Sequence, residues 1–409
     1  MRARRWLLCV AFWGGVGCEP PPPLKDSGTV GADDVDGEGD PEDSEGGVDT
    51  ADPGTDSGVA DTGTAHVGVE TDPVQLDADG DGVVAALDCD DRDPAVHPGA
   101  TEMCNRVDDD CNPATTSAGM VSFVDAAGDV TQLTDLFTSG TTGTPAVWRT
   151  VDPGTLFVCA GAYTVALEVI GTTVDIVGVD GLASTTLSGG EAGPALSVLS
   201  EAVVDIEGLA LTGGDGDTVR VEWAHLTGRD VAVSDNPRGR GVGVIAGEVA
   251  LSDCQISNNV VAGDGGGVYL GGSSELTLER CTVDGNRAQA ASHGMALGWG
   301  GGLAVSGIGV ATLTDSALTN NQAVRGGGLS VDVGSSARVD IIGGSVSANQ
   351  ADVGGGAQLV LEDRATVGLS AVELLDNVGG TITLEGATQQ LHYPGGTAVT
   401  ATCDAERCG

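Results

Sequence analysis

Residues 251–270 read LSDCQISNNVVAGDGGGVYL, a stretch in which an aliphatic segment ends in Asn259 and three glycines precede a second aliphatic segment. The same pattern returns along the chain, and its Asn recurs at positions 259, 286, 321, 349 and 377. The steps between these positions are 27, 35, 28 and 28 residues. A repeat of this length is typical of a solenoid.

Each repeat holds three short stretches of alternating apolar and polar residues, with Gly, Asn, Ser or Asp at the breaks. Examples are Gly267–Leu270, Leu276–Leu278 and Cys281–Val283. Period-two alternation between turn formers predicts β-strands, and no stretch has helical spacing. Three strands in about 27 residues close one turn of a right-handed parallel β-helix, in which each strand pairs with its equivalent one coil on. We therefore expect an all-β solenoid of about nine coils over residues 118–400, about 40 Å long at about 4.8 Å per coil.

The repeating Asn and Gly residues are expected at the corners between strands. A tight corner needs a positive φ, which Asn tolerates and Gly adopts freely. Stacked Asn side chains can also hydrogen-bond along the axis as a ladder. Because turn residues in solenoids are architectural, we expect these residues to build the rod rather than to perform chemistry.

Two parts of the chain resemble known β-helices. Residues 153–213, with the segments PGTLFVCAGAYTVALEV, VDIVGV, TTLSGG and VVDIEGLALTGG, resemble the opening coils of the pectate-lyase-like superfamily. The repeats at 251–384 are similar to those of bacterial polymorphic outer-membrane proteins. The resemblance covers about the last two thirds of the chain and implies the fold. Because many members of the first superfamily degrade acidic polysaccharides, it also calls for a search for catalytic carboxylates.

The N-terminus indicates export. Met1–Arg5 carries three Arg, and Trp6–Val16 is apolar, which predicts a cleaved signal peptide over residues 1–17. Cys18 follows small residues and resembles the lipidated Cys of bacterial lipoproteins, although Gly15 stands where Leu is usual. We expect an outer-membrane or cell-surface lipoprotein that contacts the membrane only through its lipid. Ordinary signal cleavage and secretion is the alternative.

Residues 18–75 consist mostly of Asp, Glu, Gly, Pro, Thr and Ser, a composition that cannot bury a core. We expect a disordered, self-repelling acidic tether, with a weak calcium-collecting tail as the alternative. The formal net charge of the chain is −43, and a protein this acidic repels phosphate backbones. Nucleic acid is therefore excluded as a partner, and cations are the expected small ligands.

The segment 76–117 carries the strongest metal-binding signal. Three carboxylates alternate ahead of a glycine, as in an EF-hand calcium loop: Asp77, Asp79, Asp81 and Gly82. Position seven of such a loop is Val83, which would offer its backbone carbonyl, and position twelve is Asp88, where Glu is usual. Because Asp is shorter, we expect a modest affinity. Hard oxygen ligands favour calcium over zinc or copper.

Acid clusters interlocked with cysteines follow this loop. The elements DxDGDG, DCDD, PGAxExC and DDDC resemble a short metal-binding module of bacterial surface proteins over about 36 residues. In that module the aspartates are taken as cation ligands and the cysteines as disulfides. The resemblance therefore adds Asp90, Asp91 and Asp93 to the ligand set. Solvated acids in a disulfide knot are the alternative, and a metal-scavenging protein is a further functional reading.

Cysteine usage agrees with an oxidising compartment. Of ten cysteines, Cys9 lies in the signal and Cys18 at the lipidation site, which leaves an even number for pairing. The remaining candidates are Cys89, Cys104, Cys111, Cys159, Cys254, Cys281, Cys403 and Cys408. Cys254 and Cys281 share a place in adjacent coils, where the spacing of about 4.8 Å suits a disulfide; stacked thiols are the alternative. The three cysteines of the 76–117 segment are candidates to pair with Cys159. Cys403 and Cys408 are expected to form a disulfide clip over residues 401–409.

Catalytic signals are weak. The regular coils contain no Lys, and no grouped carboxylates with a basic residue emerge from the spacing. Asp253, Arg280 and Asp315 form one column on adjacent coils, which we interpret as surface salt-bridge partners. We therefore expect a protein without enzymatic activity. A polysaccharide lyase or glycoside hydrolase is the alternative from another class.

Two places are candidates for ligand binding. The 35-residue step contains an insertion, Ala288–Trp299, that holds His293, Met295 and Trp299. Insertions on solenoids map to loops and often to the binding face; the Trp could stack on a sugar or cover the core. Trp223 with His225 is the second place, where a packed Trp is the more ordinary reading. We expect a structural or adhesive protein that binds polysaccharide or another surface protein.

Overall fold

A computed structural model of the chain describes residues 76–291, 297–332, 337–360, 366–385 and 391–392. The expected signal, tether and C-terminal clip, with Cys18, Cys403 and Cys408, lie outside these residues. Within the described ranges, no helix is both long and apolar enough to cross a membrane. Residues 76–117 form turns and contain no helix or strand.

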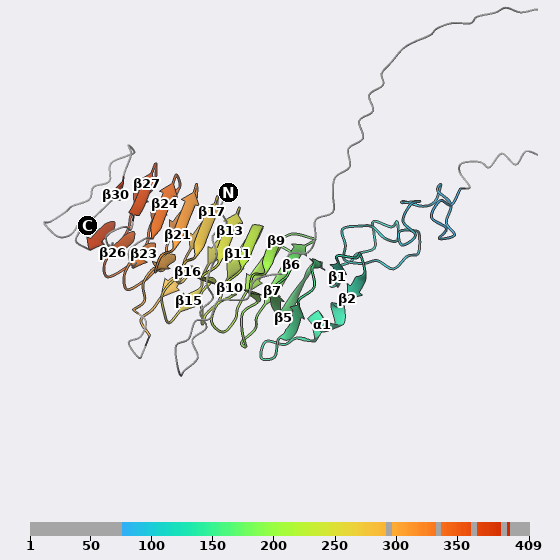
Figure 1. Cartoon of the computed structure of the whole chain (residues 1–409), viewed down its shortest axis with the longest axis horizontal. Helices are drawn as coiled ribbons and strands as arrows, with labels where there is room; N and C mark the ends of the chain where they lie inside the picture. The colour runs from blue at the N-terminus through green and yellow to red at the C-terminus, as the bar shows by residue number, and fades with distance from the viewer. Residues whose placement is uncertain (1–75, 292–296, 333–336, 361–365, 386–390, 393–409) are drawn as a thin grey trace, which may run out of the picture. The chain divides into compact units, whose positions relative to one another are not determined.

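The chain then enters a short cap before the regular coils (Figure 1). Strand β1 (Val121–Asp125) pairs antiparallel with β2 (Val130–Gln132) and with β4 (Gly154–Val158). Helix α1 (Thr134–Ser139) follows β2 and buries Phe137, whose ring packs edge-on against Tyr163. The cap therefore covers the apolar interior where the stack of coils begins.

Three stacks of parallel strands build the rod. The first contains β3 (Ala146–Thr150), β5 (Gly161–Ile170), β8 (Leu196–Leu199), β10 (Val219–Glu222), β12 (Val242–Ile245), β16 (Val268–Gly271), β20 (Leu303–Ser306), β23 (Leu329–Asp332), β26 (Ala357–Val360) and β29 (Ile382–Glu385). The second contains β4, β6 (Thr173–Gly178), β9 (Val203–Thr212), β11 (His225–Ser234), β13 (Glu248–Ser252), β17 (Glu275–Glu279), β21 (Val310–Thr314), β24 (Arg338–Ile342), β27 (Thr366–Ser370) and β30 (Leu391–His392).

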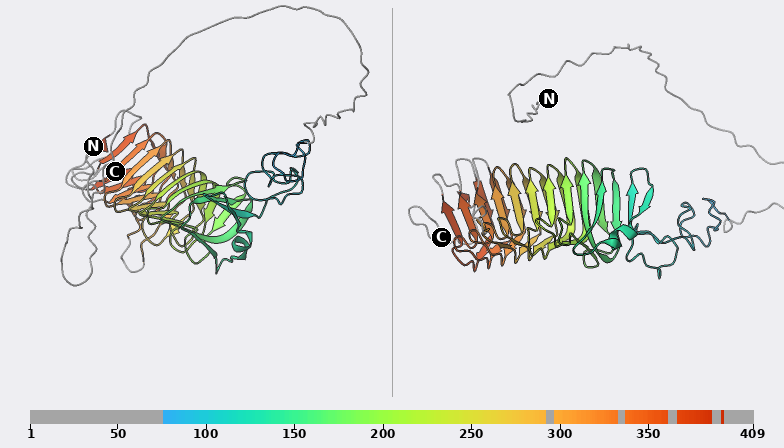
Figure 2. Two further views of the ribbon diagram at one scale, coloured as in Figure 1. Left: turned by 45° about the vertical axis from the view of Figure 1, so that its right-hand side comes forward. Right: turned by 90° about the horizontal axis from the view of Figure 1, so that it is seen from below.

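The third stack contains β7 (Thr185–Ser188), the second halves of β9 and β11, β14 (Gln255–Ser257), β18 (Thr282–Asp284), β22 (Ala317–Thr319), β25 (Ser345–Ser347) and β28 (Glu373–Leu375). A short sheet of β15 (Val260–Val261) and β19 (Arg287–Ala288) lies at one corner. Figure 2 shows the coils stacked along the long axis of the rod. From β8 to β29 the first stack makes about eight turns, and β3 and β5 precede them. The predicted fold class is confirmed.

Side chains of the same kind stack in columns inside the rod. From β6 to β27, one column in the second stack is at most 1% exposed: Val174, Val204, Leu226, Val249, Leu276, Ala311, Val339 and Val367. The 35-residue step does not disturb this register, because Val268 still pairs with Leu303 across it. The extra residues therefore loop out of the wall.

The repeating Asn residues form a buried ladder. Asn286 donates from its backbone N and its Nδ2 to Oδ1 of Asn321, at 2.9 and 3.1 Å, and its Nδ2 also donates to the carbonyl of Ile256 at 2.8 Å. The same bonds run from Asn259 to Asn377. Asn236 begins the ladder one coil earlier. Buried polar groups need such partners, so the ladder satisfies corners that no water reaches.

The positive φ angles lie one residue before the ladder, so the prediction that the repeating Asn itself takes this conformation is wrong. They fall on Asp235, Asn258, Gly285, Asn320, Ala348 and Asp376, with φ between 52° and 64°. The ladder Asn is selected for its side-chain bonds. The preceding residue makes the turn.

The last glycine of each Gly-Gly-Gly has a steric role. A Cβ on Gly302 would lie 2.6 Å from the carbonyl oxygen of Gly328 and 2.9 Å from Nδ2 of Asn321. Both distances are below normal contact, so any side chain would push the next coil and the ladder apart. Asn and Gly therefore recur together because each coil packs its glycine against the ladder of the next.

Candidate functional site

The loop from Asp77 to Asp91 is folded around its own carboxylates. Asp77 accepts backbone hydrogen bonds from Gly80 at 2.7 Å and from Gly82 at 3.0 Å. Four further aspartates of the loop each accept one such bond through Oδ1: Asp79 from Asp81, Asp81 from Val83, Asp88 from Asp90, and Asp91 from Ala78. These bonds orient the carboxylates. Both oxygens of Asp77 accept a backbone bond, whereas the other four aspartates each keep Oδ2 for another partner.

Three of these Oδ2 atoms are candidate ligands of a cation. Oδ2 of Asp79, Asp81 and Asp88 is buried and has no hydrogen-bond partner. The three carboxylates offer oxygens within 4.8 Å of one another, and Asp79 also groups with Asp77 and Asp91. Burying an unpaired carboxylate oxygen is costly, and a cation offsets that cost. The residues present therefore fit a hard divalent cation.

The electrostatics agree with this geometry. Partial burial is the main cause that raises the pKa of Asp79 above its ordinary value, and the negative charges of Asp81, Asp88 and Asp77 add to it. The hydrogen bond from the backbone of Asp81 acts in the opposite direction. Like charges held this close repel one another, and a bound cation would offset that repulsion.

Not every predicted ligand joins these two groups. Asp90 and Asp93 belong to no acidic group in the described part of the chain. The backbone carbonyl of Asp90 accepts bonds from Arg92 and Asp93, and Oδ1 of Asp93 caps the N–H of Ala95 at 3.1 Å. Val83 contributes its N–H to Asp81. The structure therefore gives Asp90 and Asp93 turn-forming roles.

A third acidic group, farther along the module, was not among the predicted ligands. Glu102, Asp108 and Asp110 offer oxygens within 4.8 Å of one another. Partial burial raises the pKa of Glu102, and the charges of Asp109, Asp110 and Asp108 raise it further. Asp109 is buried and has structural partners, the N–H of Met103 at 2.8 Å and the side chain of Asn105 at 2.9 Å. The sequence elements PGAxExC and DDDC contain Glu102, Asp108 and Asp110. Whether the two elements lie close together depends on the path of the loop between them.

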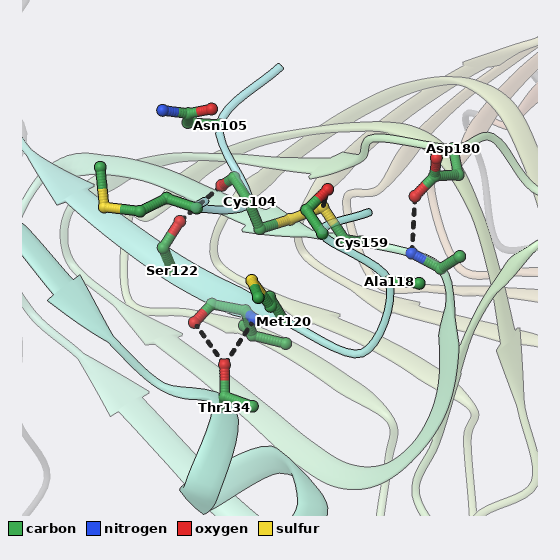
Figure 3. The surroundings of a disulfide bond; sticks show 12 residues. Cys104, Asn105, Ala118, Met120, Ser122, Thr134, Cys159 and Asp180 are labelled. Carbon is green, nitrogen blue, oxygen red and sulfur yellow. Dashed lines mark hydrogen bonds between the residues drawn. A yellow bond between two sulfur atoms is a disulfide. The ribbon is translucent and has the colours of Figure 1, made fainter. Parts of the chain in front are cut away.

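Disulfides fasten this module to itself and to the rod. Cys89 pairs with Cys111, so these sulfurs are not free to bind a metal beside Asp88. Cys104 pairs with Cys159, which follows β4, and the hydroxyl of Ser122 donates to the carbonyl of Cys104 at 2.5 Å (Figure 3). Within the rod, Cys254 pairs with Cys281 across adjacent coils, with Cα atoms 4.5 Å apart.

An ion pair adds to the junction. Arg106 of the module lies 3.5 Å from Glu207 of β9, which also binds Arg229 at 2.7 Å. The hydrogen bond from Arg229 is the main cause that lowers the pKa of Glu207, and Arg106 lowers it further. The module is therefore held to the first coils by a covalent bond and by charge.

The two aromatic candidates differ in their environments. Trp299 is half-buried, its backbone N–H donates to Oδ1 of Asp264 at 2.8 Å, and the guanidinium of Arg325 lies 5.7 Å from its ring centroid. His293 and Met295 lie outside the described residues. Trp223 is 67% exposed and has a φ of 53°. The interpretation of Trp223 as a packed side chain is therefore wrong.

Carboxylates also gather on the outer face of the second stack. Asp175 of β6 and Asp205 of β9 occupy the same register on paired strands. Partial burial and the charge of Asp205 raise the pKa of Asp175. By contrast, Asp253 is held by two bonds from Arg280, at 2.7 and 2.8 Å, and its pKa is lowered. Asp253 and Arg280 are exposed ion-pair partners, as predicted.

Comparison with protein families agrees with both parts of the chain. Residues 195–372 match a family described as "right handed beta helix region". The rod is a right-handed β-helix. Residues 88–115 match a family described as "putative metal-binding motif", whose name refers to copper binding and MopE. No curated protein and no solved structure matches the chain.

The second match covers only part of the acidic module. It begins at Asp88 and includes Glu102, Asp108 and Asp110, but not Asp77, Asp79 or Asp81. The β-helix protein thus combines the matched motif with an additional aspartate loop that precedes it.

Proposed function

We propose that the β-helix protein is a cell-surface rod with a structural or adhesive role, and that calcium orders the acidic module at its N-terminal end. The observation that carries the calcium proposal is the set of buried, unpaired Oδ2 atoms of Asp79, Asp81 and Asp88. Carboxylate oxygens are the ligands that calcium prefers, whereas copper and zinc favour nitrogen and sulfur.

The ion would be held by the carboxylates of Asp77, Asp79, Asp81, Asp88 and Asp91. It would supply positive charge to a loop whose backbone already orients these oxygens. Because the ion would bind the folded loop better than the unfolded one, it would stabilise the module and its junction with the rod.

Asp79→Asn is expected to weaken calcium binding by at least about tenfold. Asp79 belongs to both acidic groups of the Asp77–Asp91 loop, and its substitution removes one ligand charge. Isothermal titration calorimetry of the mature protein with calcium, copper and zinc measures this effect. Asp93→Asn is the matched control, since Asp93 lies outside both groups. Tight copper binding without any calcium response would contradict the proposal.

The rod itself is proposed to bind polysaccharide or another surface protein along its side. Its long lateral face and the exposed Trp223 support this role, because an aromatic ring at the surface can stack on a sugar or anchor a partner. We also propose export and a lipid anchor at Cys18, from the N-terminal sequence. Fractionation of cells into membrane and soluble material tests the anchor.

A second candidate function is polysaccharide cleavage. The observation in its favour is the Asp175 and Asp205 pair near the Glu207 and Arg229 pair on one strand face. In such a site one carboxyl with a raised pKa could act as acid and its neighbour as base or nucleophile. If the protein is an enzyme, Asp175→Asn should abolish release of reducing or unsaturated sugar from pectin or alginate, while Asp253→Asn should not. Absence of product from the unmodified protein would exclude this candidate for those polymers.

A further inference from the structure

A groove lies on the wall of the rod beside the short sheet of β15 and β19. Its volume is about 340 Å³, and its walls come from three successive coils. The lining residues are Arg287, Ala288, Gln289, Ala290, Gln322, Ala323, Val324 and Asp352. A groove of this size reaches the lower range of small-molecule sites and holds one sugar ring.

The polar side chains of the groove are available for a ligand. Within the described residues, Arg287 has no carboxylate within 4.0 Å, although most other arginines of the rod are paired. No side-chain hydrogen bond of Gln289, Gln322 or Asp352 is found there either. The backbone beneath them is fixed, since Ala288 donates to Gln322 at 2.9 Å and Asp352 to Val324 at 3.1 Å.

From this arrangement we infer that the groove binds a neutral hexose unit of a polysaccharide. The inference rests on the proposed glycan-binding role of the rod and assigns it to a place. Ala288, Ala323 and Val324 supply a small apolar floor, on which a C–H edge of a sugar ring can rest. Around that floor, Arg287 and the two amides donate hydrogen bonds, while Asp352 and the amides accept them. Neighbouring sugar hydroxyls both donate and accept, so they complement this mixed rim.

Charge decides between neutral and acidic sugars. The formal charges of Arg287 and Asp352 cancel within the groove. The chain as a whole has a formal net charge of −43, which repels a polyanion before it reaches the wall. A neutral polymer meets no such barrier and still finds every hydrogen-bonding group.

The test is calorimetry of the mature protein with short neutral oligomers of glucose, mannose and galactose, and with oligogalacturonate and oligoalginate. Arg287→Ala and Gln322→Ala are each expected to weaken binding of a neutral oligomer by at least about tenfold, the usual effect of losing a hydrogen bond to a charged or buried group. Gln350→Ala is the matched control, because Gln350 pairs with Gln322 on the next coil but does not line the groove. Ala290→Trp fills the groove from an exposed position and should also abolish binding.

The outcomes separate the inference from the proposed function. Neutral binding that survives Arg287→Ala, Gln322→Ala and Ala290→Trp would overturn the groove assignment and leave the glycan-binding role in place. Binding of the acidic oligomers alone would overturn the neutral-sugar assignment. Failure of the unmodified protein to bind any oligomer would reject both the groove and the polysaccharide role. Thermal melts of each variant confirm that the rod remains folded.

Discussion

Asn321→Ala is expected to lower the free energy of unfolding by about 3–5 kcal/mol, among the largest effects of any single substitution in the rod. Oδ1 of Asn321 accepts two bonds from Asn286, and its Nδ2 donates to the carbonyl of Val283 at 2.9 Å and to Asn349 at 3.1 Å. The side chain is fully buried. Alanine removes all four bonds and leaves the backbone N–H of Asn286 unpaired in the interior. Equilibrium unfolding in guanidinium measures the loss.

The neighbouring Asn320 is the matched control for this prediction. It is exposed, has a φ of 52°, and donates to Asp284 at 2.7 Å. The equivalent position of the next coil is Ala348, which keeps a φ of 54°. Asn320→Ala should therefore cost about 1 kcal/mol or less. Equal losses for the two variants would show that the ladder bonds do not stabilise the rod.

The architecture of the rod was predictable because its signals are local and repeated. Alternation over Gly267–Leu270 marks a strand without knowledge of its partner, and the Asn spacing gives the coil length. The register across the 35-residue step also followed, since a one-residue slip would turn every buried side chain outward. Which of two adjacent corner residues takes the positive φ was not predictable. Asn258 and Asn259 are the same amino acid, and only the stacking of coils distinguishes them.

The candidate sites also differ in how far local sequence could predict them. The candidate ligands Asp77, Asp79 and Asp81 stand at alternate positions, so their spacing alone predicted that they lie in one loop. The meeting of Glu102 with Asp108 and Asp110 depends on a turn whose course the spacing does not determine. The groove of Arg287, Gln322 and Asp352 is assembled from three coils. The break in the repeat predicted the insertion Ala288–Trp299, but it did not predict the groove on the adjacent wall of the rod.

Loss of the Cys104–Cys159 disulfide is expected to lower the free energy of unfolding by about 4 kcal/mol, because this bond closes a segment with a sequence separation of 55 residues. The double variant Cys104→Ala, Cys159→Ala avoids a free thiol and keeps both positions apolar. The acidic module of this variant should also become sensitive to protease. Without the disulfide, it is held to the cap and the rod by the Arg106–Glu207 ion pair and by the hydrogen bond from Ser122 to the backbone carbonyl at position 104. Guanidinium unfolding without reductant and limited proteolysis measure the two effects.

The double variant Cys254→Ala, Cys281→Ala provides the comparison. That disulfide has a sequence separation of 27 residues, so its loss should cost about 3.5 kcal/mol in the same chain-entropy account. It joins strands already held by the Asn ladder, and the module should stay resistant to protease. If both double variants leave the module equally protected, the Cys104–Cys159 bond does not fix the junction. The order of the module would then depend on its own loop and on the proposed cation, and the Asp79→Asn variant should become sensitive to protease in its place.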